Sequence, residues 1–118
     1  MSELEQFGNM IAEDLRDAAL NRYLDIESGH VGSETAKKLN MEVSELTEDQ
    51  KILVRKLITH CVDVGIHDFL FALEEGRNNI KVLVNETNVS EVSDGLQGEI
   101  YTADGWFEKY SQHKENGL

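Results

Sequence analysis

Apolar residues between Thr47 and Glu75 recur at three- and four-residue intervals, the spacing that gathers them on the sides of an α-helix. Thr47 stands three residues before Gln50, as in a capping box, and this pair is typical of a helix start. Gly76 follows the segment and is typical of a helix end. The sequence therefore predicts one long central helix, against which the other elements must pack.

The predicted central helix is apolar on two sides. Winding it at ~100° per residue gives a broad stripe that should face the core, formed by Ile52, Ile58, Val62, Ile66, Phe69, Leu70 and Leu73. The opposite side carries Leu53, Leu57, Val64 and Phe71, with His60, Asp63, His67 and Glu74 among them. Either the C-terminal aromatic residues cover this second side, or it is exposed and forms the site.

Two small residues lie in the middle of this helix. Gly65 should cost about 1 kcal/mol relative to alanine, so we expect another element to approach closely over residues 62–69. The alternative is a bend that divides the segment at Val64 and Gly65. Cys61 is the only cysteine, and its helical position predicts a partly buried structural thiol rather than a nucleophile.

Two further helices should precede the central one. Helical spacing of apolar residues predicts an amphipathic helix from about residue 2 or 3 to residue 27, ended by Gly29; its apolar positions are Leu4, Phe7, Ile11, Leu15, Ala18 or Ala19, Tyr23 and Ile26. Ser33 can cap a second, shorter helix, which Asn40 could divide into two pieces.

A short run of β-branched residues follows the central helix. Residues 80–84 predict a strand, whose backbone groups need a partner. Residues 99–102 could supply that partner. Alternatively, residues 90–101 could form a helix capped by Ser90 or Ser93, and a second copy of the chain could pair with the strand in a homodimer.

Residues 104–111 predict a final short helix on which Trp106 and Tyr110 share a face. These two aromatic side chains could close the core or form an interaction patch. The residues from about Gln112 onward are polar and are expected to fray. The patterns together predict a single mainly α domain over residues 1–118, an α-rich α+β fold around one long central helix, with a short strand or hairpin and a short C-terminal helix.

The charge of the chain narrows the class of partner. Its 118 residues include 23 acidic and 11 basic side chains, for a formal net charge of −12. Residues 1–50 hold 12 acidic and 4 basic side chains, and residues 51–118 hold 11 and 7, so the two parts carry −8 and −4. This balance argues against nucleic acid bound through its phosphates and against an anionic membrane surface. It favours a basic protein partner, and we predict a non-enzymatic interaction protein of the immunity or inhibitor kind.

The cysteine count and the apolar runs bear on the compartment. A single cysteine permits no intrachain disulfide, which fits a reducing environment. No signal-peptide pattern is present, and no stretch approaches the ~18 apolar residues of a membrane helix. We therefore expect a cytoplasmic protein, and no motif predicts a cofactor.

The candidate chemistry lies on the central helix. His60, Asp63 and His67 fall at spacings of three and four residues and project from one side, so they could ligate a metal if another helix supplied a fourth ligand. Their spacing matches neither HExxH nor the Glu-x-x-His of di-iron bundles, and seven residues span ~10 Å along the axis. The milder alternative is an Asp63–His67 ion pair, structural or acting as an acid–base dyad. No nucleophile accompanies these groups, so the sequence predicts no catalytic residue.

Two strings in the second half of the chain resemble those of a family of small acidic bacterial proteins of unknown function. The first is residues 64–75, which contains the run His67-Asp68-Phe69-Leu70, and the second is residues 93–101 followed by Asp104-Gly105-Trp106. The resemblance implies a bacterial source and a stand-alone domain. It implies no activity and no site residues, because that family has none assigned.

Overall fold

The first 28 residues form one continuous rod in the computed structural model, which describes residues 1–118. The rod consists of α1 (Glu3–Met10), the π-helical segment η1 (Ile11–Asp17) and α2 (Ala18–Ser28). Ser2 Oγ caps its start by accepting from the Glu5 amide at 3.1 Å. Gly29 ends the rod with a φ of 87°, a conformation that favours glycine. The predicted amphipathic helix is confirmed at both ends.

The π-helical segment is the one departure from the predicted pattern of this rod. Its wider turns place an extra residue in the repeat, so the inward side passes through Arg16 and Asp17, which are 0% and 6% exposed. Leu15, predicted on the apolar side, is 44% exposed. The prediction for Leu15 is wrong because the π segment rotates the inward side of the rod by about one residue.

The helix α3 (Glu34–Ser44) turns the chain back toward the rod. Ser33 Oγ caps it by accepting from the Ala36 amide at 3.1 Å, as predicted. Asn40 does not divide this helix. Its side-chain amide instead donates to the Ile26 carbonyl at 2.6 Å, which ties α3 to the end of α2.

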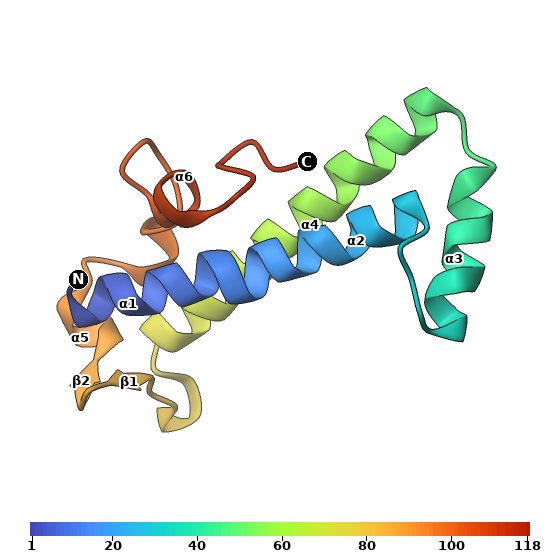
Figure 1. The fold of residues 1–118 in the computed structure, drawn as a ribbon. Helices are drawn as coiled ribbons and strands as arrows, with labels where there is room; N and C mark the ends of the chain where they lie inside the picture. The colour runs from blue at the N-terminus through green and yellow to red at the C-terminus, as the bar shows by residue number, and fades with distance from the viewer.

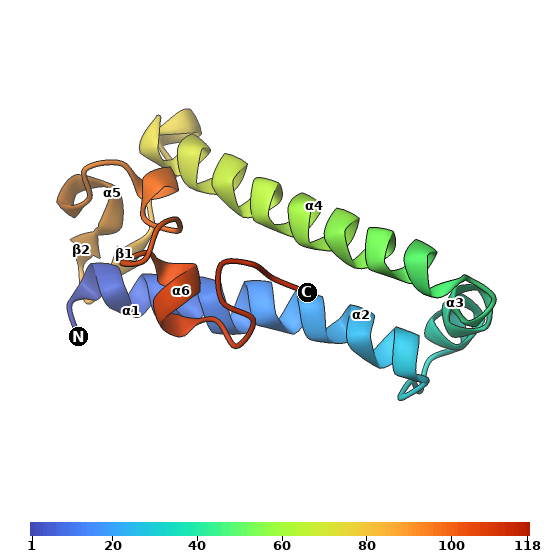
Figure 2. The same ribbon diagram turned by 90° about the horizontal axis from the view of Figure 1, so that it is seen from above.

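The central helix α4 (Glu48–Glu74) confirms the predicted bounds. Thr47 and Gln50 form the complete capping box, with reciprocal hydrogen bonds of 2.9 and 3.2 Å. The helix runs unbroken through Gly65, so the alternative of a bend is wrong. Figure 1 and Figure 2 show α4 running back beside the rod, with α3 closing one end of this pair.

The chain after α4 forms a hairpin of its own. After the short turn η2 (Arg77–Asn79), strand β1 (Leu83–Val84) pairs antiparallel with β2 (Thr87–Asn88). The predicted pairing with residues 99–102 is wrong, because Asn85 and Glu86 adopt φ of 49° and 71° and so make a two-residue turn that returns the chain at once.

Residues 90–101 do not form one helix either. A single turn, α5 (Val89–Val92), follows β2 directly and is capped by Asn88 rather than by a serine. The segment η3 (Leu96–Gly98) then leads into α6 (Trp106–Tyr110) and a non-helical tail, residues 111–118. The mainly α fold around one long helix, with a small hairpin and a short C-terminal helix, is as predicted.

The hydrophobic core lies where α1, α6 and the second half of α4 meet. Its buried members are Phe7, Ile11, Ile66, Leu70, Leu73, Val89, Leu96, Ile100, Trp106 and Phe107. Trp106 lies directly on Gly8 of α1, where a Cβ atom would stand 2.3 Å from the indole ring. Because Trp106 is 1% exposed, its side chain closes the core, which is the first of the two alternatives for these aromatic residues, whereas Tyr110 is half-buried.

The other half of the molecule has a thinner interior. The whole molecule has principal extents of 48 × 30 × 24 Å, and 19 of its 118 residues are buried. Ile52 and Phe69, predicted in the core stripe of α4, are 43% and 47% exposed. Ile52 lies on the same side of α4 as the buried Leu70 but about five turns earlier, outside the core, whose α4 members begin at Ile66. Phe69 lies at the edge of the stripe. Figure 2 shows that most of the chain after α4 lies near the second half of this helix, whereas the first turns have only the rod and α3 near them.

Candidate functional site

The second apolar side of α4 is exposed. Leu53, Leu57, Val64 and Phe71 are 56%, 52%, 38% and 39% exposed. At ~100° per residue they fall within an arc of roughly 40°. We call the exposed residues of this side the outer face of α4; they are Leu53, Leu57, Cys61, Val64, Gly65, Asp68, Phe71 and Glu75. Figure 2 shows no other element on the side of α4 that faces away from the rod, so the C-terminal aromatics do not cover it.

The two small residues of α4 belong to this outer face. A Cβ atom at Gly65 would meet nothing within 4 Å, so the predicted close approach of another element of the chain is wrong. Cys61 is exposed rather than partly buried. Both corrections have one cause, which is that the rod and the C-terminal segment pack on the other side of α4.

The three predicted site residues do not converge. Asp63 is bound by Arg16, whereas His67 Nδ1 lies 3.2 Å from the carboxylate of its neighbour Asp68. His60 is exposed on the edge of the outer face. The predicted Asp63–His67 ion pair is wrong. Asp63 pairs with Arg16 instead, because a guanidinium has two N–H donors spaced to match the two oxygens of a carboxylate. No group of three or more potential ligand side chains in the chain could hold a metal ion.

Arg16 is the centre of a buried polar cluster, which holds the tail. Its Nε and Nη2 donate to the two carboxylate oxygens of Asp63 at 2.7 and 3.0 Å. Its Nη1 donates to Ser111 Oγ at 3.0 Å and to the Lys114 carbonyl, and Nη2 also donates to the Glu115 carbonyl at 3.3 Å. Every part of the guanidinium therefore has a partner, and none is free to bind a ligand.

Further hydrogen bonds fix the tail along its length. Asp17 accepts from Ser111 Oγ at 2.5 Å and from the Gln112 amide at 2.7 Å. At the far end, the Leu118 amide donates to Thr59 Oγ1 at 3.1 Å. The prediction that residues from Gln112 fray is wrong, because the tail's backbone groups are bonded to side chains of the rod and of α4. Ser111 is 2% exposed, and its hydroxyl donates to Asp17 and accepts from Arg16.

Glu5 joins α1 to α6 at the other edge of the core. Its carboxylate accepts from Trp106 Nε1 at 3.2 Å, from the Tyr110 hydroxyl at 2.6 Å and from Lys109. Burial raises the pKa of the Glu5 carboxyl, but the hydrogen bonds from Lys109, Tyr110 and Trp106 outweigh it, and the pKa is lowered below its ordinary value. Glu5 therefore serves the packing of α6.

One hollow of about 320 Å³ lies beside the outer face, between α4 and the tail. Its lining includes His60 and Asp63, together with Lys56, Thr59, Val64, Tyr101, Asn116 and Leu118. Burial, and then Asp63 and Asp68, raise the pKa of Tyr101 above its ordinary value, so the phenol is protonated at neutral pH. The Asp63 carboxylate is already paired with Arg16, and His60 is hydrogen-bonded to no hydroxyl of the hollow, where Thr59 Oγ1 accepts from the Leu118 amide.

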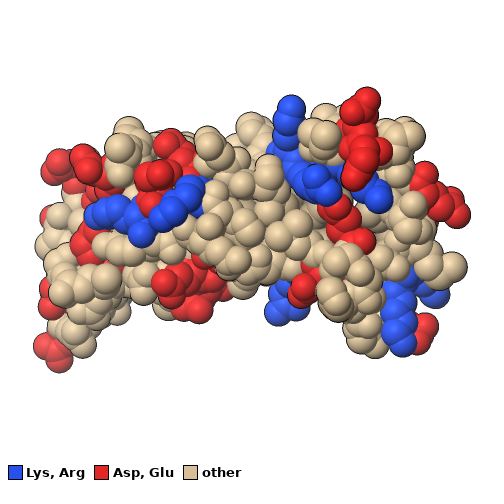
Figure 3. All heavy atoms as spheres, turned by 45° about the horizontal axis from the view of Figure 1, so that its top comes forward, with Lys and Arg blue, Asp and Glu red and all other residues tan.

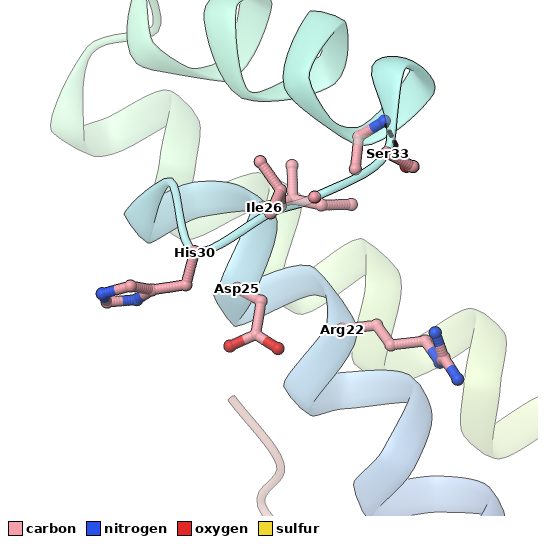
Figure 4. A pocket seen from close by; sticks show the side chains of 8 residues that line it. Arg22, Asp25, Ile26, His30 and Ser33 are labelled. Atoms are coloured by element: carbon pink, nitrogen blue, oxygen red, sulfur yellow. Dashed lines mark hydrogen bonds between the residues drawn. The ribbon is translucent and has the colours of Figure 1, made fainter.

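A second hollow, of about 340 Å³, lies at the loop between α2 and α3. Figure 4 shows the side chains of Arg22, Asp25 and His30 pointing in different directions from its wall. Ser33 is occupied by its capping bond to the Ala36 amide. Polar groups that do not converge cannot orient a ligand, so this hollow is not a candidate site.

The surface charge is dispersed. On the face in Figure 3, lysine and arginine side chains lie among aspartate and glutamate side chains, and no uniform acidic patch forms. Three of the basic residues, Arg16, Arg55 and Lys109, are paired with carboxylates. On this face the excess of acidic residues is therefore not gathered into one patch. None of the helices combines the length and apolar composition that crossing a bilayer requires.

Comparison with protein-family models, with curated proteins and with solved structures found no match to this chain. The resemblance to a family of small acidic bacterial proteins stays a prediction. Function is therefore inferred from the residues and geometry of the chain itself, and the outer face of α4 is the candidate site.

Proposed function

We propose that this protein is a non-enzymatic interaction protein that binds a basic partner, in the manner of an immunity protein or an inhibitor. The observation that carries the proposal is the outer face of α4, where apolar side chains stand exposed in a row and the only charged groups are two carboxylates. Contiguous exposed apolar surface marks interaction sites. The net charge of −12 adds a long-range attraction for a basic molecule.

The roles of the titratable groups support a binding function over catalysis. The buried ones, Arg16, Asp17 and Asp63, hold the tail, and Glu5 holds α6. Of the two histidines of α4, His67 lies beside only the exposed carboxylate of Asp68. Neither histidine is hydrogen-bonded to a hydroxyl or a thiol that could act as a nucleophile. The proposal includes a cytoplasmic location, which the single, exposed cysteine supports.

Affinity capture from an extract of the source cells tests this proposal. The immobilised protein should retain basic proteins at low ionic strength and release them at high ionic strength, because salt screens exposed charges. An unrelated immobilised protein of equal net charge is the control for non-specific retention. The proposal is wrong if nothing is retained beyond the control set, or if the retained proteins are acidic and indifferent to salt.

A further inference from the structure

We propose that the outer face of α4 docks one amphipathic helix of the basic partner, laid along its length. This inference rests on the proposed function and names the surface and the shape of the partner. Three features of the face carry it: the row of apolar side chains, the exposed glycine beside this row, and the sign of its charges.

The apolar row has the dimensions of a helix-binding surface. Leu53 and Phe71 are 18 residues apart, which at ~1.5 Å per residue is ~27 Å along the helix axis. The intervals between the four apolar residues are four, seven and seven, the spacing at which one helix contacts another. A partner helix of about five turns would cover the whole row.

No contact within the chain explains why residue 65 is a glycine. An exposed glycine in the middle of a helix costs about 1 kcal/mol relative to alanine, yet α4 is neither bent nor closely approached at this position. Cys61 lies one turn earlier on the same face and is also small and exposed. At ~100° per residue both lie beside the apolar row rather than within it. Their small size therefore leaves room for the flanking side chains of an external helix docked on the row, which packing within the chain does not require.

The charges of the face select the occupant. Asp68 and Glu75 are its only charged residues, and both are acidic. Of the three basic residues of α4, Lys51 and Arg55 lie on other sides of the helix, and Arg55 is bonded to Glu27. Lys56 is exposed at the flank of the row, about 60° around the helix from Leu53, where it lines the hollow beside the tail. A second copy of the chain would bring a further charge of −12 and repel the first. A helix with leucine-like residues at this spacing would match the apolar row, and lysine or arginine at its flanks would match the acidic charges.

Two synthetic peptides of about 18 residues, long enough to cover the ~27 Å row, serve as probes. Both have leucines at three- and four-residue intervals; one carries lysine at the remaining positions and the other glutamate. Binding to the full chain is measured by fluorescence anisotropy over a range of salt concentrations. We compare the wild type, Leu57→Ser with Val64→Ser, Gly65→Ala, and the control pair Leu39→Ser with Met41→Ser, which changes exposed apolar residues of α3.

The lysine peptide should bind at least about tenfold more tightly than the glutamate peptide, and the double variant of the outer face should lose at least about tenfold in affinity. Gly65→Ala should bind severalfold more weakly while unfolding at a higher temperature than the wild type. The α3 control pair should bind as the wild type does. This opposition of stability and affinity in Gly65→Ala is not expected of a variant that merely misfolds.

Three outcomes would overturn the inference. The control pair could weaken binding as much as the outer-face pair does, or the two peptides could bind alike. Sedimentation equilibrium could also reveal a dimer that Leu57→Ser with Val64→Ser dissociates, which would make a second copy the occupant. Repeating the cell-extract capture with that double variant separates the two proposals: undiminished capture of basic proteins leaves the proposed function standing and refutes the docking surface alone.

Discussion

Replacing Arg16 with methionine removes the group on which the tail and α4 converge. Methionine keeps much of the length and volume of the arginine side chain but offers no donor. Asp63 would lose both of its hydrogen bonds of 2.7 and 3.0 Å, and Ser111 would lose one of 3.0 Å. The variant therefore leaves a carboxylate without a partner beside the core.

The expected loss of folding stability follows from the burial of Arg16 and Asp63. Arg16 is 0% and Asp63 16% exposed at the side chain, and breaking a buried ion pair by removing one partner costs ~3–5 kcal/mol. We expect the lower end, about 3 kcal/mol, because water can reach one edge of Asp63. That is a large share of the ~5–15 kcal/mol by which domains are stable, and for a chain of this length it corresponds to a fall of roughly 10 °C in Tm.

Urea unfolding followed by circular dichroism measures the loss, with Arg55→Met as the matched control. Arg55 also pairs with a carboxylate, Glu27, which is 14% exposed, but its own side chain is 30% exposed. That variant should lose less stability than Arg16→Met, because water reaches the Arg55 guanidinium and Arg16 also binds the tail. Adding Asp63→Leu to Arg16→Met should recover most of the stability, because the unpaired carboxylate is then gone. The structural role of the cluster is refuted if Arg16→Met matches Arg55→Met, or if the second substitution lowers stability further.

Four further predictions concern the pH dependence of stability or the sign of a change in stability. Glu5→Gln should be less stable than the wild type at neutral pH, and the difference should shrink as pH falls below about 4.5, because the folded pKa of Glu5 is lowered from 4.5. Burial raises the pKa of Tyr23 to about 12 from 10; its phenolate absorbance should appear only near pH 12, and the stability that the protonated phenol contributes should be lost as pH rises from 10 toward 12. Gly8→Ala should lose ~1–3 kcal/mol by overpacking, because its Cβ would stand 2.3 Å from the Trp106 ring, whereas Gly65→Ala should gain up to ~1 kcal/mol. Thermal unfolding distinguishes these last two directions.

Each of these has its own control. Glu13→Gln removes an exposed carboxylate from the same rod, and an equal pH dependence in the two glutamine variants would contradict the role of Glu5. Tyr23→Phe should lack the alkaline decline in stability. A stable Gly8→Ala variant would mean that Trp106 does not rest on α1 as described.

The sequence by itself determined the helices and their ends. Two helices begin with a hydrogen bond between residues three apart, Thr47 with Gln50 and Ser33 with Ala36. The rod ends at Gly29, which adopts a φ of 87° that favours glycine. Such signals are local, so no knowledge of the rest of the chain is needed to interpret them. The second apolar side of α4 was visible in the same way, because a helical repeat fixes which residues share a side.

Only the tertiary structure decided which groups meet across the chain. Arg16 and Asp63 are 47 residues apart, and no local pattern distinguishes this pairing from Asp63 with His67. Arg16 lies four residues from both Ala12 and Leu20, which are 0% exposed. That spacing indicates that Arg16 points into the core. The helical period of the apolar residues instead predicted Leu15 on the inward side, because a regular period gives no sign of the π-helical segment.

Whether the outer face of α4 is covered was likewise a tertiary question. The aromatic residues of the C-terminal segment could have packed on either side of the helix, and Gly8 decided the outcome by leaving room on α1 for the ring of Trp106. Glu5 and Arg16 then fixed α6 and the tail on that same side. Side-chain periodicity specifies that a helix has two apolar sides, whereas the fit of distant residues determines which of them is left exposed.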